Sequence, residues 1–404
     1  MPIELLSPAG SVEKLRLAYA YGADAAYIGL SDFSLRTRAT NVSESDLEAV
    51  RAIKEQYGKK LYCTMNMLFD EASIELLKGQ LPAIKEWPFD AFIISDVGLV
   101  SVLREALGAE VELHLSTQAS CTNSESAAFY HQAGFKRVIL GRETPLDEIR
   151  RIKDRNPELE LEVFVHGAMC MAYSGRCLIS SYMSGRSANQ GDCAHSCRWN
   201  YRLALEEEKR PGIYFPIEEG GGYTTILSST DLCMIDYLDE LRAAGVDSLK
   251  IEGRMKSSYY VAVVTRAYRK ALDKHPDWRV YREDLFNISH REYSTGFFFR
   301  SDRGAITAEP YNRSYLFCGL FKEEIKPGIW AIEIKNQLKT GMTLEYISAD
   351  TLCIEDTSFT LLDETFCPVA QADHPKTYYL QTDKPVSTDT IIRRISTVAE
   401  RPSR

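Results

Sequence analysis

Residues 1–274 alternate between short apolar runs and longer stretches in which apolar residues recur at helical spacing. The apolar runs lie at 3–6, 25–29, 60–65, 91–94, 112–115, 138–141, 161–165 and 248–251. Short, nearly continuous apolar strands that alternate with amphipathic helices are typical of a parallel sheet buried on both faces. About eight such units predict an α/β fold, a TIM-like (β/α)₈ barrel, with a doubly wound open sheet as the alternative.

The pattern changes after residue 311, where short apolar runs are separated by turn residues such as Lys326-Pro327-Gly328. This part predicts a small antiparallel β-barrel or sandwich. We therefore expect a barrel domain at 1–274, a connecting segment at 275–311 and a β-rich domain at 312–404. One loop of the barrel, at 167–230, is far longer than the others, and loops of that length are usually functional.

Polar residues gather where the predicted strands end. In a barrel of parallel strands the carboxyl ends meet at one mouth, and the loops there build the active site. Catalytic candidates at these ends are Arg142, Glu143, His166, Glu252 and Arg254. Substrate-binding candidates are Arg36, Arg38, Gln118 and Lys250. Guanidinium groups clamp carboxylates and phosphates, so several arginines at one mouth favour an anionic ligand. Pairing of each arginine with a nearby glutamate is the simpler alternative.

Four cysteines fall in the long loop, which is otherwise rich in glycine, serine and asparagine. Six residues separate Cys170 from Cys177, and three separate Cys193 from Cys197. Four thiols in one loop are the donor set of an iron–sulfur cluster or of a structural zinc site. The usual zinc spacing of about two to four residues fits only the second pair. A polar loop of this kind packs no core of its own, so we expect a bound metal to order it.

Two further residues compete for roles near this loop. Cys233 is another thiol, but Leu232, Ile235 and Leu238 around it predict a core position on an amphipathic helix. His166 lies four residues before Cys170 and offers a Cys/His nucleophilic pair in place of a metal site. That pair would leave the other cysteines of the loop without a role, so we favour the metal.

Charge and composition exclude several classes of protein. The chain has no run of about 18 apolar residues, as a membrane-spanning helix requires. Its start lacks a signal peptide's charged and apolar regions, so we expect a cytoplasmic protein. The net charge of −9 argues against an indiscriminate nucleic-acid binder. The segment 282–303 nevertheless interleaves basic and aromatic residues, as RNA-binding surfaces do, with a core position as the alternative for its phenylalanines.

Residues 162–180 carry a motif that resembles a known signature, and they lead into the part of the long loop at 167–199, which we call the cysteine loop. Glu162-x-Phe164-x-x-Gly167-Ala168-Met169-Cys170, followed by Gly175-x-Cys177-x-x-Ser180, is similar to the signature of peptidase family U32, the collagenase-like peptidases. The stretches ELLSPAG, YGADAAYIG, LHLSTQAS and SLKIEGRMKSSYY, and the β-rich C-terminal part, resemble the tRNA-hydroxylating branch of that family. The resemblance covers essentially the whole chain.

This resemblance implies an activity and a cofactor. The branch is similar to prephenate-dependent enzymes that convert the wobble uridine of certain tRNAs to 5-hydroxyuridine. The expected partners are therefore tRNA and a small dicarboxylate, prephenate. The match carries a 4Fe–4S cluster onto Cys170, Cys177, Cys193 and Cys197, with zinc as the weaker alternative. Hydroxylation of ribosomal RNA or of a quinone precursor, a collagenase-like peptidase and a non-catalytic metal-bound scaffold are the other functions considered.

Overall fold

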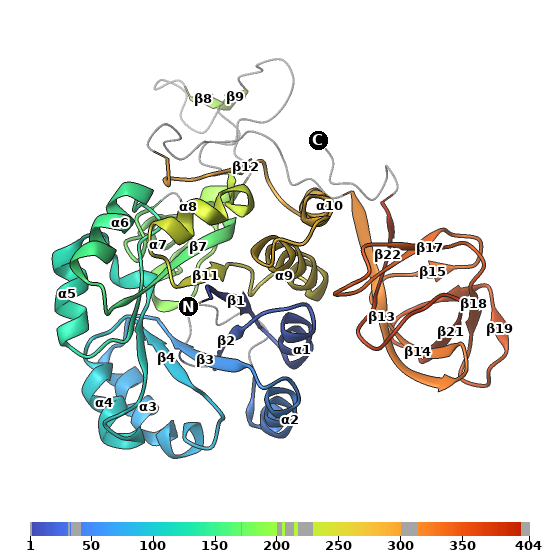
Figure 1. Ribbon diagram of the computed structural model, residues 1–404, viewed down its shortest axis with the longest axis horizontal. Coiled ribbons are helices and arrows are strands. Elements are labelled where there is room, and N and C mark those ends of the chain that lie inside the picture. Colours follow the sequence, from blue (N-terminus) through green and yellow to red (C-terminus); the bar gives the residue numbers. More distant parts are fainter. Residues whose placement is uncertain are drawn as a thin grey trace.

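The computed structural model describes residues 2–30, 33, 42–170, 172–199, 204–206, 214–216, 229–299 and 314–396. Within these residues, parallel strands form a closed barrel (Figure 1). The strands are β1 (Glu4–Pro8), β2 (Ala25–Gly29), β3 (Lys60–Met65), β4 (Ala91–Ile94), β5 (Leu113–Leu115), β6 (Arg137–Ile139), β7 (Glu160–Ala168) and β11 (Ser248–Ile251). Because β11 pairs with both β7 and β1, the ring is closed. The predicted (β/α)₈ barrel is confirmed, and the open sheet is excluded.

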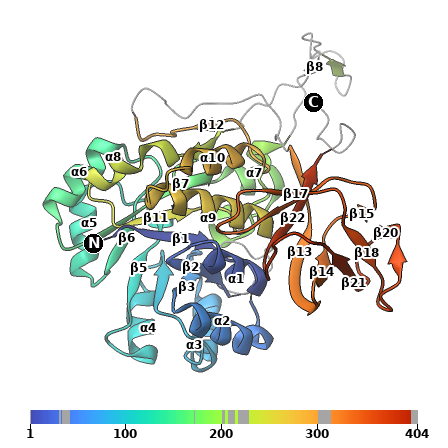
Figure 2. The ribbon, with the colours of Figure 1, turned by 45° about the vertical axis from the view of Figure 1, so that its right-hand side comes forward.

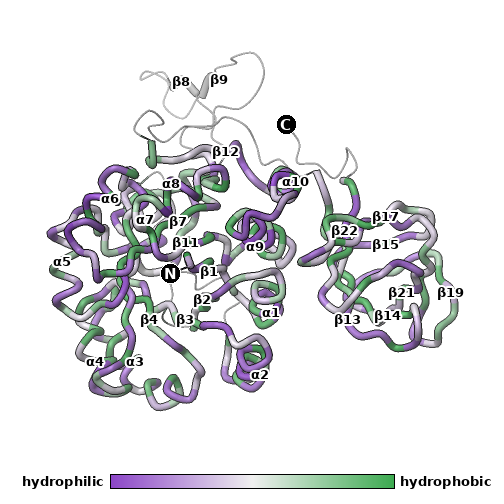
Figure 3. Tube along the Cα trace, viewed as in Figure 1, coloured by the Kyte–Doolittle hydropathy of each residue, from purple (hydrophilic) through white to green (hydrophobic). Residues whose placement is uncertain are grey.

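A ring of helices surrounds the barrel strands. It contains α1 (Val12–Ala20), α2 (Leu47–Tyr57), α3 (Glu71–Ile84), α4 (Leu99–Leu107), α5 (Ser124–Gln132), α6 (Leu146–Arg155), α8 (Leu238–Ala243) and α9 (Ser258–Leu272). Figure 3 shows these helices banded in purple and green, as expected for helices with one face on the barrel and one face outward. Covered by helices outside and by side chains inside, β2, β4 and β11 are buried at every position.

Strand β7 extends beyond the barrel, and two later strands continue the sheet from its end. β10 (Asp231–Cys233) pairs antiparallel with β7, and β12 (Tyr293–Ser294) pairs parallel with β10. Cys233 therefore lies on a strand, opposite His166, and its predicted helical position is wrong. The local apolar spacing suggested a helix, but pairing with the free edge of a strand far away in the sequence determines the structure here.

The long loop and the connecting segment contain short elements of their own. Between β7 and β10 lie α7 (Ile179–Ser184) and two paired strands, β8 (Ala204–Glu206) and β9 (Tyr214–Pro216). The segment after α9 contains α10 (Trp278–Glu283) before it reaches β12. No helix among the described residues is long and apolar enough to cross a membrane.

The C-terminal part is an antiparallel curled sheet with its own core, as the sequence predicts. Its order is β17–β16–β22–β13–β14–β21–β18–β19, and β15 and β20 form a separate pair. The strands are β13 (Tyr315–Lys326), β14 (Ile329–Ile334), β15 (Leu338–Lys339), β16 (Leu344–Ile347), β17 (Ile354–Asp356), β18 (Thr360–Leu362), β19 (Pro368–Val369), β20 (Gln371–Ala372), β21 (Tyr378–Gln381) and β22 (Ile391–Ile395). Phe321, Tyr346 and Ile392 are among the fully buried side chains of this core.

Buried polar contacts join this sheet to the barrel domain. Figures 1 and 2 both show β13 and β22 beside α9 and α10. The guanidinium of Arg393 on β22 lies 2.8 Å from Asp284, just after α10, and 2.9 Å from Glu345. The Tyr21 hydroxyl, after α1, donates to the backbone carbonyls of Ile347 and Asp389. Because these groups are buried and paired, the two parts are held together by specific contacts.

Candidate active site

A cavity of about 140 Å³ lies at the carboxyl ends of the barrel strands. Its wall includes Tyr27 of β2, Thr64 of β3 and Phe164 of β7. Of the site residues predicted from the sequence, it gathers Gln118, Arg142, Cys170, Cys177, Cys193, Cys197, Lys250, Glu252 and Arg254. The described residues of the long loop that carry the four cysteines therefore lie at the same mouth as the strand-end cations.

Arg142 follows β6, and its guanidinium contacts a backbone carbonyl, a carboxylate and an aromatic ring. One terminal nitrogen donates to the backbone carbonyl of Ala168 at 2.6 Å, and the other lies 3.6 Å from the carboxylate of Glu252. The guanidinium carbon lies 3.9 Å from the centre of the Phe164 ring, in a cation–π contact. Its Nε is buried and has no hydrogen-bond partner among the described residues. An unsatisfied buried donor on a cation at a cavity wall favours an anionic ligand.

Lys250 and Arg254 bring two further cations to the cavity from β11 and the residues after it. The Lys250 ammonium donates to Glu162 at 2.9 Å and lies 4.5 Å from the centre of the Tyr27 ring. Burial lowers the pKa of Lys250, and the neighbouring Glu162 opposes that shift. Arg254 is 4% exposed and donates to the hydroxyl of Thr64 at 2.9 Å. With Arg142, these side chains give the cavity a cationic wall.

The cysteine loop is ordered around its thiols by local polar contacts. Asn189 donates to the Cys177 carbonyl at 3.0 Å, and the Ser180 hydroxyl accepts from the backbone N–H of Ala194 at 2.9 Å. The His195 N–H donates to the Cys193 sulfur at 3.4 Å, from a residue whose φ of 57° is in the left-handed region. Such N–H···S contacts tune iron–sulfur centres.

The four thiols are a donor set that either an iron–sulfur cluster or a structural zinc ion uses. In the part of the chain that the structure describes, no group of three or more His, Cys, Asp or Glu side chains is arranged to hold one metal ion. A zinc site needs all four sulfurs about 2.3 Å from one point. A cubane cluster instead spreads its four thiolates over four irons, so its ligands lie farther apart. The donor set and its common cavity fit that group.

Glu143 fixes the cysteine loop and does not line the cavity. Its carboxylate accepts from the backbone N–H of Ser174 at 2.9 Å and from the Ser174 hydroxyl. At the next residue, a Cβ on Gly175 would lie 1.9 Å from the Gln118 carbonyl, and φ there is +75°. Only glycine allows this close approach of two backbones. Glu143 and Gly175 therefore seat the loop on the barrel mouth.

His166 lies outside the cavity, on the helix side of β7. The pairing register of β7 and β11 shifts between Phe164 and His166, which turns the imidazole away from the barrel interior. Its ring is buried among those of Tyr260, Tyr268 and Tyr293, and burial lowers its pKa to about 3. His166 is thus a neutral ring at neutral pH, and it does not share the cavity of Cys170.

Three other predictions have different outcomes. Cys233 does not line the cavity, and burial raises its pKa to about 11. Arg36 and Arg38 lie outside the described residues. The basic and aromatic segment proves to be packed, where it is described. Arg291 is 2% exposed and lies 2.7 Å from Asp231, His290 stacks on Tyr293, and Phe298 is buried.

The sequence reasoning missed the inward-facing residues within the strands. Thr64 and Phe164 are examples, and both contact the cationic wall. The alternation of Glu162 and Phe164 along one predicted strand was the available signal, because side chains two apart share a face. The register shift after Phe164 is what ended that alternation.

Comparison with known proteins places the chain in a family. Residues 10–307 match the model of peptidase family U32, and residues 313–393 match its C-terminal domain. The chain is 36% identical to tRNA hydroxylation protein P of Escherichia coli over 390 residues, covering 85% of this chain and 86% of that protein. It is 33% identical to tRNA hydroxylation protein P1 of Bacillus subtilis, covering 97% and 94%.

A third relative is matched over less than half of its own length. The 23S rRNA 5-hydroxycytidine synthase of Escherichia coli is 37% identical over 271 residues, covering 67% of this chain and 39% of that protein. The two domain models of this family together cover both the barrel and the curled sheet. The protein therefore belongs to peptidase family U32.

Proposed function

We propose that this protein is an RNA hydroxylase that forms 5-hydroxyuridine at the wobble position of tRNA. The observation that carries the proposal is the cavity, which joins four thiols to a cationic wall at the mouth of the barrel. Its support comes from relatives named for tRNA hydroxylation, similar over most of their length, and from one named for hydroxylation of a ribosomal cytidine.

The size of the cavity suits a single pyrimidine ring. A cavity of about 150 Å³ accommodates benzene, so 140 Å³ offers room for one six-membered ring. Enzymes that modify a base extrude it from its stack into a pocket. The enclosed space therefore fits one flipped uracil or the ring of a small cosubstrate, with the remainder of either molecule at the mouth.

Prephenate, the proposed hydroxyl donor, fits the charge of the wall. It carries two carboxylates, and guanidinium groups bind carboxylates through paired hydrogen bonds. Arg142 has an unsatisfied donor for this purpose, and Arg254 and Lys250 line the same cavity. Glu252 lies against Arg142 and orients its guanidinium.

The proposed cofactor is a 4Fe–4S cluster held by Cys170, Cys177, Cys193 and Cys197. Such a cluster would supply redox chemistry beside the base. The chain's own residues bind and orient: the loop contacts of Asn189 and Ser180 position the thiols, and the cationic wall positions the carboxylates. Metal content of anaerobically purified protein tests this part. We expect about four irons per chain and brown colour, and colourless protein with one zinc would contradict it.

Individual thiols can be tested against a matched control. Replacing Cys170, Cys177, Cys193 or Cys197 by Ser should remove most of the iron, because each would hold one iron of the cluster. Cys367→Ser is the control, since that exposed thiol lies in the curled sheet and should leave the iron content unchanged. Iron retained in all four loop variants would contradict the assignment.

The activity itself is tested by nucleoside mass spectrometry of a deletion strain. The tRNA and the ribosomal RNA are isolated and digested separately, so that each is tested as the substrate. Loss of 5-hydroxyuridine derivatives from tRNA, restored by the wild-type gene, is the expected result. Loss of a hydroxylated nucleoside from ribosomal RNA alone would show that the substrate is ribosomal RNA. No change in either RNA, with no redundant enzyme present, would refute the function.

A further inference from the structure

The cysteine loop carries an unusual set of exposed apolar side chains. Tyr173, Leu178, Tyr182, Met183 and Trp199 are 61, 72, 89, 44 and 43% exposed, and we refer to them as the rim patch. Large apolar side chains gathered on one exposed surface usually mark a binding site. Each of these five side chains keeps at least 43% of its surface exposed.

One residue of the rim patch also belongs to the cavity wall. Tyr173 both lines the cavity and is exposed, so it stands at the mouth. α7, which carries Tyr182 and Met183, packs against the short helix Ser196–Arg198 that precedes Trp199. The indole N–H of Trp199 donates to the Ala194 carbonyl at 3.2 Å, which fixes the ring within the loop.

The part of the long loop at 172–199 has a net positive charge in an acidic protein. Residues 172–199 contain three arginines and one acidic residue, Asp192, whereas the whole chain has a net charge of −9. Asp192 pairs with Arg186 at 2.8 Å. Arg176, between Tyr173 and Leu178, is exposed and has no ion pair among the described residues. A cation that stands free among exposed aromatic rings is suited to a polyanion that also presents flat rings.

We propose that the rim patch is a stacking platform for the unpaired nucleotides that flank the target base in an RNA loop. This rests on the proposed function, which puts the target base in the cavity beside the patch. Aromatic side chains stack on bases of any identity, and a nearby arginine holds the phosphate backbone. A base within a duplex is stacked on its neighbours and offers no free face, so the patch selects single-stranded loops.

The test measures binding of two synthetic RNAs to anaerobically purified holoprotein. One is a stem with an unpaired uridine-containing loop, and the other is a fully paired duplex of the same charge. Tyr182→Ser and Trp199→Ala should each weaken stem-loop binding about 5- to 150-fold, as expected for one lost stacking contact. Duplex binding and iron content should not change.

Two control variants separate stacking from general damage. Trp199→Phe keeps a ring and should bind the stem-loop within about threefold of wild type. Phe129→Ala removes a side chain that is 62% exposed on α5, outside the loop, and should have no effect. Wild-type affinity in Tyr182→Ser and Trp199→Ala would overturn the proposal. So would a self-association of the wild-type protein that Tyr182→Ser abolishes, because the patch would then join two copies of this chain.

The same variants distinguish this proposal from the proposed function. Suppose that wild type hydroxylates tRNA and that purified Tyr182→Ser has the same KM for tRNA as purified wild type. The stacking platform is then wrong, and the proposed function stands. A raised KM with an unchanged kcat supports the platform. If the patch variants lose stem-loop binding but wild type hydroxylates no RNA, the platform stands and the function is wrong.

Discussion

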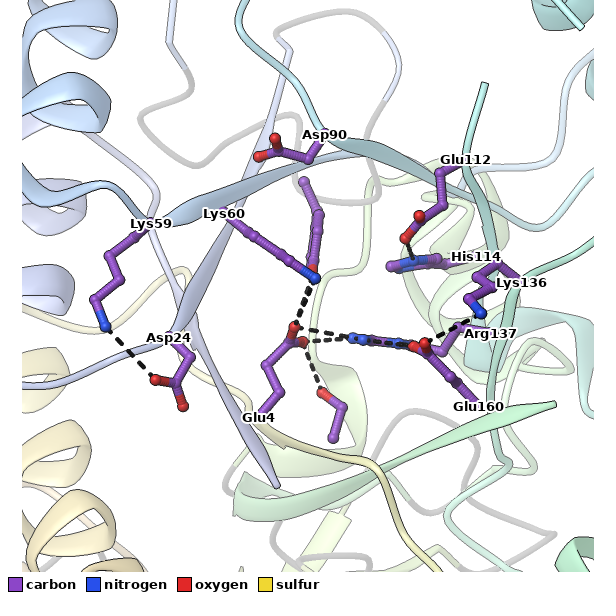
Figure 4. Close-up of polar contacts among 12 residues, drawn as sticks. Glu4, Asp24, Lys59, Lys60, Asp90, Glu112, His114, Lys136, Arg137 and Glu160 are labelled. Carbon is purple, nitrogen blue, oxygen red and sulfur yellow. Dashed lines mark hydrogen bonds and ion pairs between the residues drawn. The ribbon is translucent and has the colours of Figure 1, made fainter. Parts of the chain in front are cut away.

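The two ends of the barrel both contain buried cations, but they use them differently. At the amino end Arg137 of β6 lies 2.5 Å from Glu4 and 2.8 Å from Glu160 (Figure 4). A third carboxylate, that of Glu162, lies 3.0 Å from Arg137. At the carboxyl end Arg142 has one carboxylate at 3.6 Å and an unsatisfied Nε. Arg137 is thus surrounded by carboxylates of the fold, whereas Arg142 keeps one donor that no described residue satisfies.

The titratable groups at the amino end of the barrel are paired with one another. Figure 4 shows Glu4 between Lys60 and Arg137, and Glu112 directed at His114. Burial opposes the charge of Arg137, but Glu162 and Glu4 raise its pKa. Burial likewise acts to raise the pKa of Glu4, and Arg137 lowers it below its usual range. In barrels of this kind, the amino face serves stability and the carboxyl face serves function. The difference between the two arginines agrees with that division.

The largest expected effect is on stability and comes from Arg137→Ala. Removing this side chain leaves the buried carboxylate of Glu4 without its main partner and leaves Glu162 with Lys250 as its cationic partner. The free energy of unfolding should fall by about 3–5 kcal/mol, measured by denaturant titration. Arg151→Ala, which breaks an exposed pair with Glu148, is the control and should change it by less than about 1 kcal/mol. A similarly small change in unfolding free energy in both variants would show that the Arg137 contacts at the amino end do not stabilise the fold.

Lys250→Met should affect both ends, because Lys250 bonds to Glu162 and also lines the cavity. We expect a loss of about 2–3 kcal/mol in unfolding free energy, from the unpaired buried carboxylate. Prephenate binding, measured by calorimetry, should weaken about tenfold from the lost charge. Lys78→Met, at an exposed pair on α3, should do neither. If only the unfolding free energy or only prephenate binding changes, Lys250 contributes to stability or to binding and not to both.

Acid should weaken the amino end through Glu162. Burial acts to raise the pKa of Glu162, but Lys250 and Arg137 lower it to about 2 from 4.5. A folded-state pKa below the unfolded one stabilises the fold fully above about pH 4.5 and progressively less as pH falls toward 2. Unfolding free energy should therefore decline across that window, and Glu162→Gln should decline less steeply. Glu125→Gln, at an exposed position, should keep the wild-type slope.

The smallest expected effect comes from Glu143→Gln. Its carboxylate holds the cysteine loop at Ser174, so the variant should lose about 1 kcal/mol of loop stability and some iron. Hydroxylation per bound iron should stay unchanged, because Glu143 does not line the cavity. A fall in activity per iron would instead support the catalytic role that the sequence suggested for it.

The sequence predicted the barrel strands well because local residues determine them. Ala25–Gly29, Lys60–Met65, Ala91–Ile94 and Ser248–Ile251 agree with the predicted apolar runs residue for residue. β7 is longer than predicted because its end pairs with β10, whose residues are far away in the sequence. Cys233 was misplaced for the same reason.

The site was predicted only in part. The local sequence indicates where a strand ends, but the direction of each side chain depends on pairing with distant residues. Arg142 and Glu143 are adjacent, yet only Arg142 faces the cavity. His166 was expected at the mouth, and a register shift that no local pattern reveals turned it outward. The amino-end network was not foreseen, because Glu4 and Arg137 meet across 133 positions of the chain.

One measurement tests most directly whether the carboxyl end performs RNA hydroxylation. A deletion strain is complemented with wild type, with Arg254→Lys at the cavity and with Glu160→Gln at the amino end, at matched protein levels. Lysine keeps the charge of Arg254 but not its planar donors. Nucleoside mass spectrometry of tRNA should show 5-hydroxyuridine derivatives restored by wild type and by Glu160→Gln, and reduced at least about tenfold with Arg254→Lys. Full restoration by Arg254→Lys, or none by wild type, would contradict the account.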